Sequence, residues 1–343
     1  METQRTTRTR NRRRWVAVAA ALTAAVLGVT GCGSSSSKNE VSIVGFSILK
    51  GVNAKVIADF AKTDAGKGVK FVQSYGASGD QSRSVVSGLK ADVVHFSLEG
   101  DLTRLVDDKI VASDWNAGPT KGIASQSVVV IAVRKGNPKN IKGWADLIKP
   151  GVKIVTPDPG SSGSARWNIL AAYGSVIAQG GTEAQATDYL TKFYANVATL
   201  PKSGREATST FQSGVGDVLI SYENEAIAAR ASGAAIDYFV PDQTLLIQNP
   251  AAVTTTASQA GKDFLAYLLS KDGQLDYAES GFRPLVDVGT YTVKGANDPA
   301  NAFPAPTTLL TVDKDFGGWP AAATKFFDDK DGIVTKIQAA AGK

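Results

Sequence analysis

The stretch GSSGSARW (residues 160–167) lies between a short apolar run, VKIVTP (152–157), and a longer apolar segment, NILAAYGSVIAQ (168–179). This order is typical of a buried strand, a loop of small residues and a helix. A second stretch, SYGASGDQSRS (74–84), follows the apolar run VKFVQ (69–73) in the same order. A chain that repeats strand, loop and helix is expected to have an α/β fold.

Further runs rich in Val and Ile predict a mostly parallel sheet whose strands are buried on both faces. The strand-like runs lie at residues 41–46, 91–96, 127–135 and 217–222, and additional helix-like segments lie at 54–64 and 182–197. With 343 residues, the chain is long enough for two domains of ordinary size. Because no long linker divides it, we expect two α/β lobes, each with its own sheet, connected by crossing strands.

Residues 1–31 have the features of an export signal, with six arginines followed by an apolar run at 16–29. The run ends in Val-Thr-Gly-Cys, which resembles a bacterial lipobox, and Cys32 is the only cysteine in the chain. We therefore expect secretion, lipid attachment at Cys32 and a polar tether over 32–40. Twin-arginine export is the alternative to the general route. Without residues 1–31, basic and acidic side chains balance at 31 each, which argues against a nucleic-acid partner.

Four loops rich in Ser, Gly or other polar residues follow predicted strands, at 74–84, 160–167, 201–210 and 221–226. In open α/β sheets, ligands bind beyond the carboxyl ends of the strands. Glycine lets backbone N–H groups point together, and a helix N-terminus adds unpaired N–H groups with a partial positive charge. Several such loops together predict an anion site made of neutral donors. Taken singly, each loop could equally be an ordinary helix cap or turn.

Enzymatic alternatives have less support in the sequence. Neither a Gly-x-Ser-x-Gly nucleophile elbow nor a Gly-x-x-x-x-Gly-Lys-Ser/Thr phosphate loop occurs. His95 is the only histidine, so a catalytic triad would depend on it alone, and a histidine-based metal site is excluded. A serine hydrolase using Ser78 or Ser162 stays open as the rival function, and a scaffold lipoprotein without a ligand is a third reading. We expect no catalysis, cofactor or metal.

Several segments resemble the sulfate/thiosulfate-binding proteins of ABC importers. The resemblance covers most of residues 41–319 and is carried by SYGASGDQS, AVRKGNPKNI, DLIKPGVKIVTPDPGSSGSARWNILAAYG, GVGDVLISYENEA and FGGW. It implies a two-lobe periplasmic-binding-protein fold of type II that closes around sulfate or thiosulfate. It also implies a monomer that delivers the anion to a membrane permease outside the cytoplasm. The lipobox favours the lipoprotein form found in actinobacteria.

The resemblance implies which residues contact the anion: Ser47, Ser78, Ser162, Gly163, Ser164, Gly204 and Tyr222. Ser47 stands where the family has an aspartate that donates its backbone N–H, and Tyr222 stands where it has a tryptophan that donates its indole N–H. Asp80 replaces a lysine, and we expect it to pair with Arg83, three residues on, and to turn away from the anion. Supporting roles behind the loops are expected for Arg83, Arg166 and Arg205.

The resemblance also implies the lobe boundaries. Lobe one is expected over 41–118 and 249–298, and lobe two over 119–248 and 299–343, with crossing strands near 124–133 and 245–255. A site of donors alone suits sulfate, which carries no proton at neutral pH, whereas hydrogen phosphate needs one acceptor. Another oxyanion, phosphate or molybdate, remains the alternative ligand.

Overall fold

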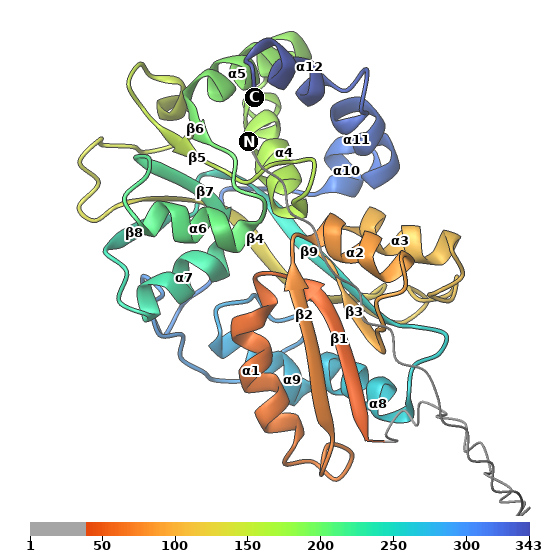
Figure 1. The fold of residues 1–343 in the computed structure, drawn as a ribbon. Helices are drawn as coiled ribbons and strands as arrows, with labels where there is room; N and C mark the ends of the chain where they lie inside the picture. The colour runs from red at the N-terminus through yellow and green to blue at the C-terminus, as the bar shows by residue number, and fades with distance from the viewer. Residues whose placement is uncertain (1–38) are drawn as a thin grey trace, which may run out of the picture. The chain divides into compact units, whose positions relative to one another are not determined.

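The computed structural model describes residues 39–343, and the predicted export signal, Cys32 and nearly all of the tether lie outside this range. Over these residues strands and helices alternate, as the sequence predicts (Figure 1). Nowhere between residues 39 and 343 is a helix both long and apolar enough to cross a membrane.

The strands of the described residues are linked by pairing in the order β2-β1-β3-β9-β4-β7-β5-β6, with β10 beside β9 and β8 beside β4. Their bounds are β1 Glu40–Phe46, β2 Lys70–Gly76, β3 Val93–His95, β4 Ile123–Arg134, β5 Ile154–Val155, β6 Val197–Thr199, β7 Val218–Tyr222, β8 Ile236–Phe239, β9 Gln243–Val253 and β10 Thr308–Leu310.

Four of the helices begin within the four loops that the sequence singles out. Their bounds are α1 Leu49–Phe60, α2 Ser78–Val86, α3 Glu99–Asp107, η1 Trp144–Ile148 (a 3-10 helix), α4 Gly163–Ala178, α5 Glu183–Asn196, α6 Gly204–Gln212, α7 Glu223–Ala231, α8 Gln259–Leu269, α9 Lys271–Glu279, α10 Val312–Phe316, α11 Gly318–Phe327 and α12 Ile333–Ala340. Figure 1 shows α1, α8 and α9 beside β1–β3, and α4–α6 beside β5–β7.

Two long strands, β4 and β9, connect the two halves of the sheet. β9 pairs with β3 at residues 251–253 and with β4 at 246–250, and β4 continues past it to pair with β7 and β8. The predicted crossing strands are therefore confirmed. The expectation of separate sheets is wrong, because the pairing of β4 with β9 joins the strands of both halves into one continuous series of hydrogen-bonded strands.

The sheet is more mixed and less buried than the sequence predicts. β1 pairs in parallel with β2 and β3, whereas the crossing strands pair antiparallel with β3, β7 and β8. β1 and β7 are buried on both faces, as expected for continuous apolar runs. β2 is not, because it lies at the edge of the sheet and leaves Val72 54% exposed. An apolar run alone does not distinguish a central strand from an edge strand.

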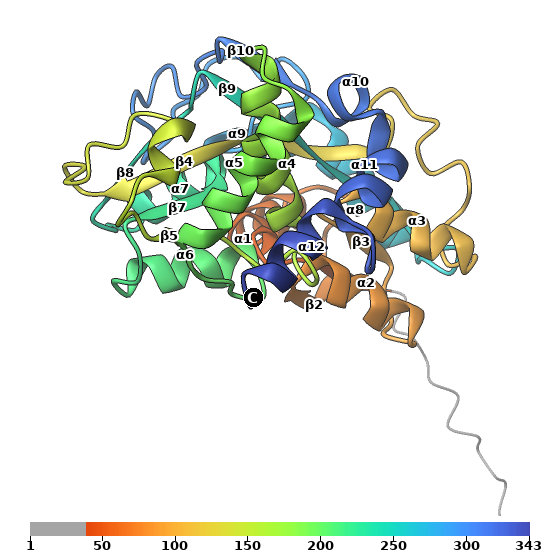
Figure 2. The ribbon, with the colours of Figure 1, turned by 90° about the horizontal axis from the view of Figure 1, so that it is seen from above.

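Helix α4 carries one of the predicted loops at its N-terminus and is anchored on several sides. Most of its residues are buried, and it packs against α5, β9 and the C-terminal helices (Figure 2). Trp167 packs edge-on against Trp319 of α11 with ring centroids 4.7 Å apart, and Tyr173 packs against Phe326 at 4.8 Å. Burial of such large rings contributes about 2–3 kcal/mol each and holds the N-terminus of α4 in place.

The single histidine, His95, is a packed core residue at the end of β3. It is 1% exposed, and its Nε2 lies 3.1 Å from the Ser125 hydroxyl. Burial lowers the pKa of His95 to about 3. In the unfolded chain, by contrast, His95 takes up a proton near pH 6.5. The contribution of the neutral, buried His95 to stability is therefore fully present above pH 6.5, and it is lost as the pH falls from 6.5 to 3.

We therefore expect the only imidazole in the protein to show no titration by NMR between pH 8 and about 4.5. Below pH 6.5 the free energy of unfolding should decrease with a slope of up to about 1.4 kcal/mol per pH unit from this group. A His95→Gln variant should lack that part of the slope. An imidazole that titrates near pH 6.5 in the folded protein would contradict this expectation.

Candidate functional site

The predicted loops lie at the carboxyl ends of their strands and meet one another. The Gly79 N–H at the start of α2 donates to the Ser161 carbonyl over 3.2 Å, and the Arg205 N–H donates to the Ser47 hydroxyl over 3.4 Å. At Gly204, a Cβ atom would lie 3.0 Å from the Ser164 hydroxyl. Segments far apart in the sequence are thus brought to one place, between the two halves of the sheet.

Two helix N-termini converge at this place. α4 begins at Gly163, and its N-cap residue, Ser162, makes no capping hydrogen bond with its side chain. α6 begins at Gly204. The first N–H groups of a helix have no partner within it, and each N-terminus carries a partial charge of about +0.5. Ser164, in the first turn of α4, is buried, and its hydroxyl has no hydrogen-bond partner among residues 39–343. Unused donors and positive helix ends together favour an anion.

Two serines of the predicted set, Ser47 and Ser78, differ in which hydrogen-bond donors they have free. The Ser78 hydroxyl accepts a hydrogen bond from the Ser97 N–H over 2.9 Å, so its own proton is left for another acceptor. The Ser47 N–H donates to the Gly76 carbonyl over 2.7 Å. The backbone N–H that the resemblance assigns to the anion is therefore already used at Ser47, and only its hydroxyl proton is left to donate.

Tyr222 is the last residue of β7 and is fully buried. Its hydroxyl lies 2.7 Å from the Ser97 hydroxyl. Burial raises the pKa of Tyr222 far above its usual range, while nearby groups, Ser97, Asn249 and Ser164, lower this pKa to a smaller extent. Tyr222 is therefore a neutral hydroxyl at every physiological pH. The Ser164 contact is close enough to affect this pKa but lacks good hydrogen-bond geometry.

Of the three arginines behind the loops, Arg166 and Arg205 donate to backbone carbonyls, whereas Arg83 pairs with a carboxylate. Arg83 pairs with Asp80 over 2.5 Å at a half-exposed position, so the expected pair is present. The Arg166 Nε donates to the Pro159 carbonyl over 3.0 Å. Arg205 donates to the Ile48 carbonyl over 3.3 Å and thereby links α6 to the start of α1.

Sequence reasoning missed two buried carboxylates at the start of α7. Glu225 lies 2.7 Å from the Arg205 guanidinium, and Glu223 accepts two hydrogen bonds from Arg283, over 2.7 and 3.1 Å. Burial raises the pKa of both carboxyls, and the neighbouring arginines lower it. A run of Glu-Asn-Glu after a strand gives no indication that two of its side chains are nearly inaccessible.

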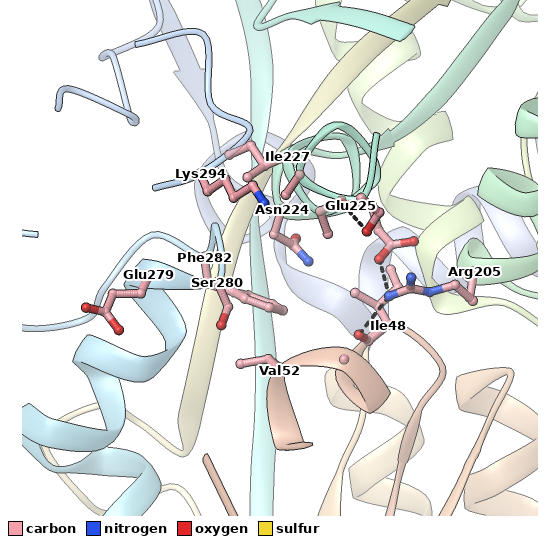
Figure 3. Close-up of a pocket in the computed structure, with 14 residues that line it drawn as sticks. Ile48, Val52, Arg205, Asn224, Glu225, Ile227, Glu279, Ser280, Phe282 and Lys294 are labelled. Atoms are coloured by element: carbon pink, nitrogen blue, oxygen red, sulfur yellow. Dashed lines mark hydrogen bonds and ion pairs between the residues drawn. The ribbon is translucent and has the colours of Figure 1, made fainter. Parts of the chain in front are cut away.

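A pocket of about 310 Å³ lies beside the Arg205–Glu225 pair. It is lined by Ile48, just before α1, by Val52 of α1 and by Asn224 and Glu225 of α7, so it opens between the two halves of the sheet (Figure 3). None of the residues predicted to contact the anion is among those that line this pocket.

Sequence reasoning also missed Ser97, which lies two residues after the end of β3 and is 1% exposed. It contacts Ser78, Tyr222 and Trp167, each through a different polar atom. Its position shortly after a predicted strand could have identified it, because four other loops after predicted strands were singled out for the same reason.

The rival serine hydrolase lacks its general base. The His95 ring nitrogens have Ser125 and Tyr277 as neighbours, so neither Ser78 nor Ser162 is paired with the only imidazole. Within residues 39–343, no group of three or more His, Cys, Asp or Glu side chains could hold a metal ion.

A fold of two α/β halves joined by crossing strands, with helix N-termini converging between them, defines the two-lobe solute-binding proteins. Solved structures of this class align with the chain. One is the periplasmic binding protein AfuA from Actinobacillus pleuropneumoniae, with a TM-score of 0.63, 17% identity and coverage of 88% of this chain and 98% of that one. At this identity the likeness concerns the fold alone.

The chain matches the family model "Bacterial extracellular solute-binding protein" over residues 43–283. It is 38% identical to a sulfate-binding protein of Synechococcus elongatus, over 97% of this chain and 98% of the relative. It is 33% identical to a thiosulfate-binding protein of Pseudomonas aeruginosa, over 80% and 84%. The sulfate-binding protein SubI from Mycobacterium tuberculosis has a TM-score of 0.79 and 42% identity, over 84% of this chain and 100% of that one. The chain belongs to this solute-binding family, and within it to the sulfate- and thiosulfate-binding proteins.

Proposed function

We propose that the protein captures sulfate, and thiosulfate as a second ligand, between its two lobes and delivers it to the membrane subunits of an ABC importer. The observation that carries the proposal is the unpartnered, buried Ser164 hydroxyl at the N-terminus of α4, facing the N-terminus of α6. The names of the relatives, sulfate- and thiosulfate-binding proteins, support the choice of anion.

The proposed contacts are neutral donors. Hydroxyl groups come from Ser47, Ser78, Ser164 and Tyr222, and the backbone N–H groups come from the first turns of α4 and α6 at Gly163 and Gly204. Ser162, the N-cap residue of α4, lies beside them, and its side chain makes no capping hydrogen bond. Arg166 and Arg205 hold the loop peptides from behind, Arg83 supports the start of α2 through its pair with Asp80, and none of the three touches the anion. Sulfate, a permanent dianion, can accept a hydrogen bond from each of these donors. The protein binds the anion without changing it chemically.

Binding and release are proposed to follow hinge closure around the crossing strands β4 and β9. Lobe one comprises 41–118 and 249–298, and lobe two comprises 119–248 and 299–343. An anion that contacts both lobes only in the closed form shifts the open–closed equilibrium toward closure. Lipid attachment at Cys32, after removal of residues 1–31, would keep the monomer at the outer face of the membrane.

A panel of oxyanions tests the proposal with the purified protein. Sulfate and thiosulfate should raise the melting temperature, with a stabilisation of about 2.7 kcal/mol at a hundred times the dissociation constant. Molybdate and phosphate are the competing ligands in the same panel. If no oxyanion shifts the melting temperature and calorimetry detects no binding at about 1 mM, the proposed function is wrong.

Sulfate affinity should be nearly constant between about pH 5 and 8, because the reference pKa values of the ligand and the proposed contacts lie outside that range. Burial raises the pKa of Glu225, so this carboxyl is the group expected to cause any change in sulfate affinity at the acid end of the range. Its protonation removes a negative charge near the anion, so affinity should rise at the acid end. Calorimetric titrations across the range measure this, and an affinity that falls steadily toward pH 5 would count against a site of neutral donors.

A further inference from the structure

Arg166 differs from the other arginines of residues 39–343 in its hydrogen bonds. Each of the other six donates through at least one terminal nitrogen of its guanidinium. Arg166 donates only through Nε, to the Pro159 carbonyl over 3.0 Å, and its terminal nitrogens, Nη1 and Nη2, have no partner in this part of the chain. Because a guanidinium is charged at every physiological pH, Arg166 is a positive charge with unused donors.

Two contacts fix the orientation of this guanidinium. The bond from Nε to Pro159 holds one edge, and the Phe327 ring covers one face, with its centroid 4.9 Å from the Arg166 Cζ. Arg166 is also partly buried, and this burial lowers its pKa. The side chain has therefore already lost much of its freedom and hydration, so a ligand that meets the terminal nitrogens causes little further loss of either.

Arg166 lines a cavity of about 400 Å³, which we call the arginine cavity. Its walls come from both halves of the molecule: Arg83 of α2 and Arg104 of α3 from the first, and residues 158–160 with part of α12 from the second. Within residues 39–343, Arg104 donates only through Nη1, so its Nε and Nη2 are also unused. Two guanidiniums with free donors therefore line one cavity.

Two carboxylates line the arginine cavity, and two more pair with its arginines. Three of the four accept hydrogen bonds, from Arg83, Arg104 and Gly160 respectively: Asp80, Asp101 and Asp158. The fourth, Asp329, is exposed and raises the pKa of Arg166, but it forms no ion pair within the described residues. Asp329 is therefore the group that competes with a bound anion for Arg166.

We propose that the arginine cavity is a second anion site, which takes a phosphate or sulfate group between Arg166 and Arg104. Guanidinium groups suit such anions, because two parallel N–H donors match two oxygens of the anion. The volume is in the range of small-molecule pockets, so the group can be a free ion or part of a small ester. None of the residues predicted to contact sulfate at the first site lines this cavity.

Calorimetric titrations at pH 8 with inorganic phosphate and with phenyl phosphate test the proposal, in just enough sulfate to fill the first site. We expect one anion to bind per protein, with a dissociation constant on the order of 1 mM. Binding of inorganic phosphate alone identifies a site for the free ion. Phenyl phosphate that binds at least as tightly identifies a site for an ester, and phenol, which lacks the charged group, should not bind. Either anion result supports the proposal.

Arg104→Gln should weaken phosphate binding by about tenfold or more, the usual effect of losing a hydrogen bond between charged groups, and should leave sulfate affinity at the first site unchanged. Asp329→Asn should strengthen phosphate binding by about threefold, because it removes the competing charge. Arg230→Gln is the matched control. Arg230 also lies over an aromatic ring, that of Tyr238, and donates to Asn297, but it does not line the cavity. This variant should keep the phosphate affinity.

The inference is overturned if neither anion binds at about 10 mM, or if Arg104→Gln loses no more affinity than Arg230→Gln does. It is also overturned if Asp329→Asn lowers the free energy of unfolding and leaves phosphate affinity unchanged, because Asp329 is then the partner of Arg166. If the unchanged protein binds phosphate as expected but binds no sulfate, the proposed function is wrong and the second site stands.

A crystal structure of the unchanged protein with sulfate and phenyl phosphate locates the anion directly. A phosphate oxygen should lie within about 3 Å of an Arg166 terminal nitrogen. Phenyl phosphate found only between the N-termini of α4 and α6 would overturn the second site.

Discussion

Gly163→Ala should reduce sulfate affinity by about a hundredfold or more while leaving the protein folded. A Cβ at Gly163 would lie 2.6 Å from the Ser97 hydroxyl oxygen, 2.7 Å from the Ser97 Cβ and 2.8 Å from the Leu98 Cγ. Real Cβ atoms are not found this close to other atoms, so the N-terminus of α4 must move away from the loop after β3. If this movement makes closure of the two lobes about 3 kcal/mol less favourable, sulfate affinity falls on the order of a hundredfold.

Calorimetry measures the affinity, and circular dichroism with thermal melting checks the fold. Gly100→Ala is the matched control, because Gly100 lies in α3 and a Cβ there meets nothing within 4 Å. It should keep full affinity. If Gly163→Ala binds sulfate as tightly as Gly100→Ala does, the α4 N-terminus is not part of the site.

Arg283→Met should lower the free energy of unfolding by about 3–5 kcal/mol, the usual result of leaving a buried charge without its partner. Glu223 is 0% exposed, and both of its carboxylate oxygens accept from Arg283. Without the guanidinium the pKa of Glu223 should rise, because burial then acts unopposed. The loss of stability should therefore be largest at neutral pH and smaller where the carboxyl is protonated.

Denaturant unfolding at pH 7 and at pH 5 measures both effects. The double variant Arg283→Met with Glu223→Met should recover most of the lost stability, since it removes the unpaired charge as well. Lys192→Met is the control for an exposed pair, with Asp188, and should cost less than about 1 kcal/mol. If Arg283→Met lowers the free energy of unfolding no more than Lys192→Met does, the buried pair of Arg283 and Glu223 contributes little to stability.

The strand and loop positions could be predicted because they depend on short-range patterns. Runs of β-branched residues became β1, β4 and β7, and the Ser- and Gly-rich segments after strands became helix starts. The pairing of Asp80 with Arg83 also follows from local spacing, since residues three apart on a helix are neighbours.

The features that could not be predicted depend on contacts between distant segments. Nothing in the Glu223-Asn224-Glu225 run shows that Arg283 and Arg205 will bury its carboxylates. The contacts of Ser97 depend on distant segments meeting, and the use of the Ser47 N–H depends on the end of β2. The exposed edge of β2 depends on which strand has no further neighbour.

The shared pair of crossing strands has a consequence for how the chain reaches this structure. β3 pairs with β9, so Val93 finds its partner in Val253, after nearly the whole of the second half of the sheet has been made. Contacts between residues so far apart in sequence close large loops and slow folding. The first 120 residues therefore lack the strand that completes their sheet until β9 is synthesised. Because β9 pairs with β3 in one half and with β4 in the other, neither half of the sheet can be completed before β9 is made.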